Sequence, residues 1–224
     1  WNVLRVLRVD DESGKIFFVG VGREPGDPYF QYLYSVSMDG GPVHLLTPDS
    51  ANHEVTFSPD GEYFIDDYST PLDPGAEVLR DLEGREVVHL ETGDISNLEA
   101  AGWKAPIPFS AKARDGVTDT YGFMYTPTHP APNYKYPVVN YLYPGPQSGS
   151  VGSRSFFPVR REHQAMAELG FIVVTLDAMG TPGRSKSFHD AYYGNMGDNG
   201  LPDQIAAIRQ LASQRPWMDL DRVG

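Results

Sequence analysis

Residues 136–157 read YPVVNYLYPGPQSGSVGSRSFF, and this stretch decides how the chain is interpreted. Residues 138–142 form an apolar run that predicts a buried strand. The run stops at Tyr143, where Pro-Gly-Pro and a series of glycines and serines predict a loop. The question is why a buried strand ends on a tyrosine and opens into small polar residues.

The residues after this loop predict an α/β sheet. A short helix is expected over residues 161–169, with Gly170 in its C-terminal stop position. Residues 171–177 predict a second strand that is apolar on both faces, as a parallel sheet requires. A polar loop over residues 181–199 and a helix opened by Pro202 follow. This order is that of a doubly wound sheet, in which ligands bind at the carboxyl ends of the strands.

The helix opened by Pro202 has one apolar stripe and ends at Arg215-Pro216. The stripe consists of Ile205, Ile208, Leu211 and Ala212. Asp203 lies in the first turn, where a carboxylate favours the positive end of the helix dipole. We therefore expect Asp203 to be structural and worth at most about 1 kcal/mol.

The first ninety or so residues predict only strands, separated by turns rich in Gly, Pro and Asp. The expected strands are residues 16–21, 31–37, 42–46, 54–58, 63–68, 77–81 and 86–90. Repeated meanders of four strands, about 40–50 residues long, are typical of β-propeller blades. About two blades are present, whereas propellers usually need four to eight, so a small β-sandwich is the alternative.

Composition excludes several classes of function. The formal net charge of −12 disfavours binding to nucleic acid or to anionic membranes. The chain has no cysteine, so it can form neither a disulfide nor a thiolate metal site. No apolar run approaches the roughly 18 residues of a membrane span. Because the chain begins Trp-Asn-Val without Met and its last residues resemble the start of a strand, both ends are interpreted as cuts through a longer protein.

Tyr143 and Asp177 lie at the carboxyl ends of the two predicted parallel strands. The phenol of Tyr143 could stabilise an oxyanion, or it could simply pack its ring and hydrogen-bond nearby. Asp177 could be a catalytic carboxylate, or it could cap the turn that follows it. Spacing alone favours the structural alternative for both residues.

Other motifs are weaker. No serine of the chain lies in the Gly-x-Ser-x-Gly elbow that exposes a nucleophile, and no Gly-rich loop is closed by Lys-Ser or Lys-Thr as phosphate binding requires. Metal ligation is not favoured for the histidines and aspartates of the C-terminal half, and no cofactor is expected. These residues are His163, His189, Asp190 and Asp198, and hydrogen bonding within the loop is the simplest role for His189. Arg154, Arg160 and Arg161 could grip a carboxylate, although a solvated helix start is favoured for the last two.

Taken together, these stretches resemble the prolyl oligopeptidase family, and most of all its bacterial dipeptidyl peptidase IV-like serine peptidases. The resemblance rests on KYPVVNYLYPGPQSGSVGSRSFF (135–157), on ELGFIVVTLDAMGTPGRSKSFHDAYYGNMGDNGLPDQIAAIRQL (168–211) and on DLDRVG (219–224). IFFVGVGREPGDPYFQYLYSVSMDGG (16–41) and FSPDGEYFIDDYST (57–70) resemble the last blades of that family's propeller.

The resemblance implies a β-propeller that caps an α/β-hydrolase domain. It divides this chain into the last propeller blades (1–92), a connector (93–107) and the truncated N-terminal part of the hydrolase domain (108–224). It assigns the hydroxyl of Tyr143 to the oxyanion hole, and it places the nucleophilic serine, followed by the triad Asp and His, beyond Gly224. The chain alone is therefore expected to be inactive.

Two features of the family's pattern are not matched by this chain. The family often has Asp-x-Arg-Gly where this chain has Asp177-Ala-Met-Gly180, so the family pattern gives no argument about how this loop is anchored, whereas the assignment of Tyr143 is unaffected. Glu24 and Glu54 do not match the glutamates that hold the peptide amino terminus, because those glutamates come from an earlier blade.

The resemblance implies a peptidase that releases dipeptides or cuts short peptides through a serine acyl-enzyme. The alternatives are an esterase or acyl-peptide hydrolase of the same fold, and a non-catalytic propeller binding module. The expected partner is a peptide substrate, and a homodimer of the full-length enzyme is compatible with the resemblance. A periplasmic or secreted location is expected on the same basis.

Overall fold

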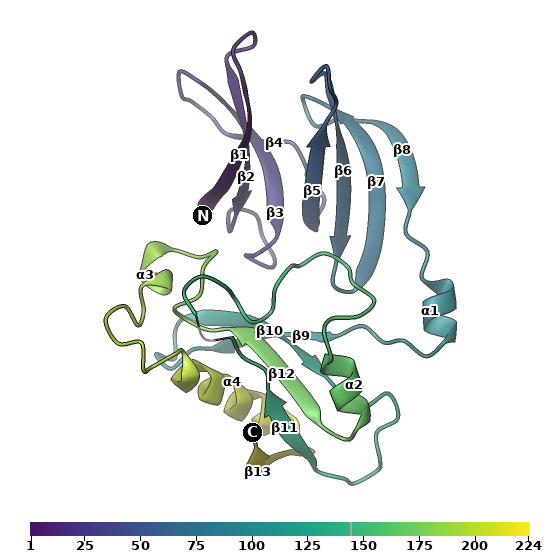
Figure 1. Cartoon of the computed structure of the whole chain (residues 1–224), viewed down its shortest axis with the longest axis vertical. Helices are drawn as coiled ribbons and strands as arrows, with labels where there is room; N and C mark the ends of the chain where they lie inside the picture. Colours follow the sequence, from purple (N-terminus) through teal and green to yellow (C-terminus); the bar gives the residue numbers. More distant parts are fainter. Residues whose placement is uncertain (144) are drawn as a thin grey trace. The chain divides into compact units, whose positions relative to one another are not determined.

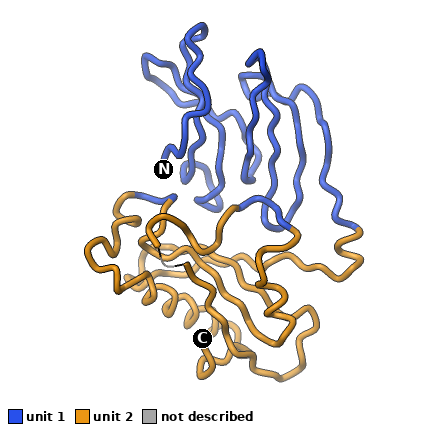
Figure 2. Tube along the Cα trace, viewed as in Figure 1, with its two compact units in different colours: residues 1–96, 154–157, 183–185 blue, residues 97–153, 158–182, 186–224 orange. Residues whose placement is uncertain are grey.

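The computed structural model describes residues 1–143 and 145–224, which divide into two compact units. Unit 1 consists of residues 1–96, 154–157 and 183–185, and unit 2 consists of residues 97–153, 158–182 and 186–224 (Figure 2). Two short segments from the C-terminal half of the chain thus belong to the unit that the N-terminal strands build.

Unit 1, as far as it is described, contains two antiparallel four-stranded sheets whose strands follow one another in chain order (Figure 1). The first sheet consists of β1 (Asn2–Asp10), β2 (Lys15–Val21), β3 (Gln31–Ser37) and β4 (His44–Leu45). The second consists of β5 (Asn52–Phe57), β6 (Tyr63–Thr70), β7 (Asp73–Asp81) and β8 (Glu86–Thr92). Sequential four-stranded meanders are the topology of propeller blades, as predicted.

The two blades share an apolar core. Phe17, Leu33 and Leu46 from the first blade pack with Phe64 from the second. Strand β1 was not predicted, because most of its side chains are exposed and no alternation of apolar and polar residues marks it. Strand β4 is only two residues long instead of the predicted five.

Unit 2 is built around a sheet with strand order β13-β11-β12-β10-β9 in the described residues. The strands are β9 (Ile107–Lys112), β10 (Asp119–Tyr125), β11 (Tyr136–Asn140), β12 (Ile172–Asp177) and β13 (Met218–Val223). Strand β11 pairs in parallel with both β12 and β13, whereas β10 and β9 form an antiparallel hairpin at one side. The mixed sheet matches the predicted start of an α/β domain.

Helices cover both faces of this sheet. Helix α4 (Leu201–Gln214) packs Ala207, Ile208 and Leu211 against one face, and α2 (His163–Glu168) packs Ala167 against the other. All residues of β12 are buried, as the prediction of a strand with apolar residues on both faces implied. Two shorter helices are α1 (Ser96–Ala100) and α3 (Lys186–His189), the latter inside the segment predicted to be a loop.

The buried face of α4 differs from the predicted stripe. Ile205 is 42% exposed, whereas Asp203 and Gln204 are buried. Asp203 accepts hydrogen bonds from Arg114 Nε (2.7 Å) and from the backbone N–H of Met179 (3.1 Å). Arg114 also donates to Asp198, and this hydrogen bond lowers the pKa of Asp198. Asp203 is therefore structural, as expected, but through an ion pair between its buried carboxylate and the exposed Arg114 as well as through the helix dipole.

Asp203→Asn is accordingly expected to cost about 1.5–3 kcal/mol, more than the helix dipole alone implies, because a charged acceptor of several hydrogen bonds is lost. The matched control is Asp190→Asn, which removes an exposed ion pair with Lys186 worth about 0–1 kcal/mol. The free energy of unfolding of each variant would be measured in urea, with hydrogen exchange of the α4 amides as the readout. Equal losses in the two variants would contradict the buried role of Asp203.

Candidate functional site

Tyr143 and Asp177 lie at the same edge of the sheet of unit 2. Strand β11 ends at Asn140, three residues before Tyr143, and Asp177 is the last residue of β12. Because β11 and β12 are parallel, their carboxyl ends share one edge. Tyr143 is 51% exposed and Asp177 is 3% exposed, so one side chain is available at the surface and the other is enclosed.

The backbone of Tyr143 is held from both sides. Its N–H donates to the hydroxyl oxygen of Ser150 over 2.8 Å, and its carbonyl accepts from the N–H of Gly145 over 3.0 Å. Ser150 is buried, so this bond is partly shielded from competing water. The loop thus folds back onto the residue from which it starts, and the exposed side chain of Tyr143 projects from a fixed backbone.

Asp177 anchors the same loop. Its Oδ1 accepts from the N–H of Val151 over 3.1 Å. A Cβ on Gly149 would lie 2.4 Å from this oxygen, so the close approach of the backbone requires glycine at that position. This carboxylate thus hydrogen-bonds to the loop that follows β11, and its expected role as the cap of the turn after its own strand stays a prediction. Ser150 and Gly149 were missed as site residues because no local signal marks a serine or glycine among several.

A histidine and a backbone amide complete the anchoring around this edge. His189 Nε2 donates to the carbonyl oxygen of Pro146 over 2.7 Å, which confirms the expected loop hydrogen bond. The N–H of Met179 donates to Asp203 of α4. The segment Asp177-Ala-Met-Gly180, which differs from the family's Asp-x-Arg-Gly, is therefore held by a hydrogen bond to that helix. Both contacts restrain loops at the carboxyl edge of the sheet.

The residues considered for metal binding have other partners. His163 is buried between the rings of Tyr125 and Tyr141, and burial lowers its pKa. Asp198 pairs with Arg114, and Asp190 pairs with Lys186. Among the residues described, no group of three or more His, Asp or Glu side chains has the arrangement of a metal site.

Arg154, Arg160 and Arg161 differ in burial and in the groups that they contact. Arg154 is 2% exposed and its Nε donates to Asp27 Oδ2 over 2.9 Å, so it does grip a carboxylate, one that belongs to the protein itself. Arg160 lies over the ring of Phe123 and donates to the carbonyl of Ser153, which corrects its interpretation as a solvated residue. Arg161 is exposed, as expected.

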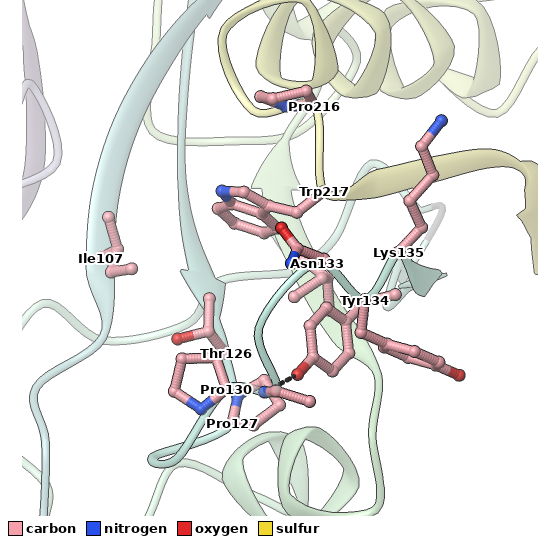
Figure 3. A pocket seen from close by; sticks show the side chains of 12 residues that line it. Ile107, Thr126, Pro127, Pro130, Asn133, Tyr134, Lys135, Pro216 and Trp217 are labelled. Carbon is pink, nitrogen blue, oxygen red and sulfur yellow. Dashed lines mark hydrogen bonds between the residues drawn. The ribbon is translucent and has the colours of Figure 1, made fainter.

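A pocket of about 560 Å³ lies at the opposite edge of the sheet (Figure 3). Its lining includes Tyr136, Ile172 and Trp217, which stand at or just before the amino ends of β11, β12 and β13. The hydroxyl of Tyr136 accepts from the N–H of Ala131 over 2.6 Å inside it. Neither Tyr143 nor Asp177 lines this pocket, so its size does not mark the predicted site.

Comparison with known families matches both parts of the chain. Residues 157–224 match the prolyl oligopeptidase family, and residues 1–75 match the dipeptidyl peptidase IV N-terminal region. Over residues 157–224 the chain is similar to the prolyl oligopeptidase family. The resemblance seen in the sequence and the predicted combination of propeller blades with the start of a hydrolase domain are thereby confirmed.

Individual relatives of the chain are named as dipeptidyl peptidases, in agreement with the family matches. The chain is 30% identical to human dipeptidyl peptidase 8 over 236 residues, which cover 100% of this chain and 26% of the relative. It is also 30% identical to a protein assigned as dipeptidyl-aminopeptidase B in Aspergillus terreus, with 100% and 24% coverage. A crystal structure of a Bacteroides ovatus protein assigned as a dipeptidyl aminopeptidase IV superposes with a TM-score of 0.83 and 25% identity, over 99% of this chain and 31% of that one.

The chain spans about a quarter of the length of the curated relatives it matches. None of the helices in the described part of the chain has the length and apolar content needed to cross a lipid bilayer.

Proposed function

We propose that this chain forms the end of the propeller and the first part of the catalytic domain of a serine peptidase. The enzyme would hydrolyse peptide bonds through a serine acyl-enzyme, releasing dipeptides or cutting short peptides. The observation that carries the proposal is the half-exposed Tyr143 at the carboxyl edge of the sheet, on a backbone fixed by Ser150. Similarity to the prolyl oligopeptidase family supports the reaction class.

Acyl transfer to a serine requires hydrogen-bond donors at the position of the substrate's carbonyl oxygen. Attack of a serine on a peptide carbonyl places negative charge on the carbonyl oxygen, and preorganised N–H or O–H groups aimed at that oxygen lower the barrier. The Tyr143 hydroxyl would be one donor, and the backbone N–H after the nucleophile would be the other. The fixed backbone of Tyr143 supports this role, because a donor helps most when it needs no reorganisation during the reaction. We place the nucleophile, the aspartate and the histidine of the triad beyond Gly224.

Labelling with a fluorophosphonate probe tests the proposal. The full-length protein should be labelled at one serine outside residues 1–224, whereas the chain 1–224 alone should not react and should not cleave a dipeptidyl substrate. The reason is that none of its serines lies in a nucleophile elbow. Labelling of a serine within residues 1–224 would contradict the proposal.

Substrate assays separate the alternatives. Cleavage of dipeptidyl amides by the full-length protein supports a dipeptidyl peptidase, and preference for acyl-peptides or simple esters supports the other hydrolases of this fold. If the full-length protein is not labelled by the probe at all, the result supports the third alternative, a non-catalytic binding module. A periplasmic or secreted location and a homodimer are further parts of the proposal, which rest on the family resemblance; cell fractionation and sedimentation would test them.

A further inference from the structure

Arg161 is an exposed cation whose charge is not used inside the described part of the protein. Arg154 and Arg160 both donate hydrogen bonds to other parts of the chain. Arg161 forms no ion pair with a described carboxylate, and its guanidinium carbon lies 5.6 Å from the centre of the Tyr141 ring. Of the three arginines that could grip a carboxylate, Arg161 is therefore the one whose charge a ligand can reach.

The backbone of Arg161 adopts a conformation that is rare for arginine. Its φ is 52°, in the left-handed region, where the Cβ of an L-residue crowds a neighbouring carbonyl oxygen. The other described residues besides glycine with a positive φ are Asn133 and Asn199, and asparagine tolerates this region far better. Strained residues of this kind cluster at active sites and ligand-binding sites. Asparagine or glycine would suit this backbone better, so the presence of arginine indicates a use for its charge.

Tyr141 fixes the place of this cation. Its N–H donates to the carbonyl of Val174 over 2.8 Å, which continues the pairing of β11 with β12. Its ring meets the ring of the buried His163 edge-on, with 4.5 Å between the ring centres. A guanidinium over a ring that is held in this way gains a cation–π contact, and its N–H groups remain available to an anion.

The cation lies near the candidate oxyanion donor. Tyr141 precedes Tyr143 by two positions, and Cα atoms at this spacing are at most about 7 Å apart. These residues and Arg161 all belong to unit 2. Arg161 thus stands at the carboxyl edge of the sheet, where sheets of this class bind ligands. An extended peptide whose reacting carbonyl lies at Tyr143 needs about two to four residues to reach the guanidinium.

Charge makes a carboxylate the ligand that suits Arg161. A guanidinium binds a carboxylate through two parallel N–H bonds. The formal net charge of the chain is −12, so its overall field repels anions and a local cation is needed to bind one. When a dipeptide is released, it carries the amino terminus of the substrate. A carboxylate about two to four residues from the reacting carbonyl therefore belongs to the leaving part, and in a short peptide it is the C-terminal carboxylate.

We propose that Arg161 is a specificity-determining residue that binds the C-terminal carboxylate of a short peptide substrate. The inference rests on the proposed function, because it takes Tyr143 to mark the position of the reacting carbonyl. The carboxylate is remote from the reacting atoms, so the contact is equally strong in the ground state and in the transition state. Arg161 therefore lowers KM for such substrates and leaves kcat nearly unchanged.

Peptides of about three to five residues, each with a free or an amidated C-terminus, test this role in the full-length protein. Arg161→Asn removes the cation and suits the left-handed backbone, so thermal unfolding should show a protein at least as stable as the original. Its KM for the free acids should rise about 5- to 10-fold, the size expected for loss of a charged hydrogen bond that water partly screens. Its KM for the amides should stay unchanged.

Two further variants sharpen the comparison. Arg161→Lys keeps a positive charge without the planar fork, and it should give an intermediate KM for the free acids. The matched control is Arg209→Gln, which removes one exposed positive charge from α4 and so measures the effect of net charge alone. Arg209→Gln should leave the KM of both kinds of peptide unchanged. Added salt should weaken the preference of the original protein for free acids.

The outcomes separate this inference from the proposed function. Cleavage of free acids and amides by the original protein with equal KM would overturn the role of Arg161 while the peptidase function stands. An equal rise in KM for both kinds of peptide in Arg161→Asn would also overturn it, because the residue would then act on the structure of the site. If the original protein cleaves neither kind of peptide, the proposed function fails, and this inference fails with it.

Discussion

Replacing Tyr143 by Phe in the full-length protein is expected to lower kcat about 100- to 1000-fold. The change removes one oxygen and leaves the ring in place. The hydroxyl of Tyr143 belongs to a side chain that is half exposed, so its loss should not disturb the core. A donor that acts mainly on the oxyanion contributes little to binding of the ground-state carbonyl, and KM should therefore change far less than kcat.

The matched control for this prediction is Tyr134→Phe. Tyr134 is exposed to a similar degree, 45%, and it lines the pocket at the opposite edge of the same sheet. Steady-state kinetics with a dipeptidyl substrate and thermal unfolding of both variants give the comparison. A Tyr143→Phe protein with normal turnover, or one whose loss of turnover tracks a loss of folded protein, would refute the oxyanion role.

Local patterns predicted much of the fold. The largely apolar residues 171–177, with apolar side chains on both faces, predicted a strand covered on both sides, and helices α2 and α4 cover it. The turn residues predicted the meanders of unit 1, and Pro202 marked the first turn of α4. These features depend on neighbours in the sequence, which is why they could be inferred without coordinates.

The contacts that hold the loop after β11, in unit 2, and the segment 154–157, in unit 1, are not local. Asp177 binds Val151, 26 positions earlier, and Arg154 binds Asp27, 127 positions earlier. Neither partner has a signature of its own, since an aspartate in a turn-rich loop is ordinary. The family resemblance therefore predicted a role for Tyr143 in the oxyanion hole. The sequence did not reveal which residues hold the loop that follows Tyr143.

The second large effect is expected inside unit 1, at a buried charged cluster that no pattern predicted. Asp66 is fully buried in β6, with its Oδ2 accepting from Arg80 Nε over 2.8 Å. Its Oδ1 lies 2.7 Å from His53 Nδ1. Arg80 Nη2 also donates to Asp49 over 2.6 Å, and His53 Nε2 donates to the carbonyl of Asp49 over 2.9 Å. The cluster links β5, β6 and β7 with the segment before β5.

Asp66→Asn is expected to destabilise the second blade by about 3–5 kcal/mol, because Arg80 stays buried after losing the carboxylate at its Nε. Asp67→Asn is the matched control, one residue along the same strand, where the side chain points to the opposite face. Asp67 is exposed at its surface, but its carboxylate is partly shielded from water and lies near the charges of Glu54 and Glu77, and both effects raise its pKa. Neutralising it relieves repulsion and should leave stability unchanged or slightly higher. Hydrogen exchange of strands β5–β8 with increasing urea measures both variants on the blade itself. Similar exchange in the two variants would show that the Asp66 cluster does not hold the blade together.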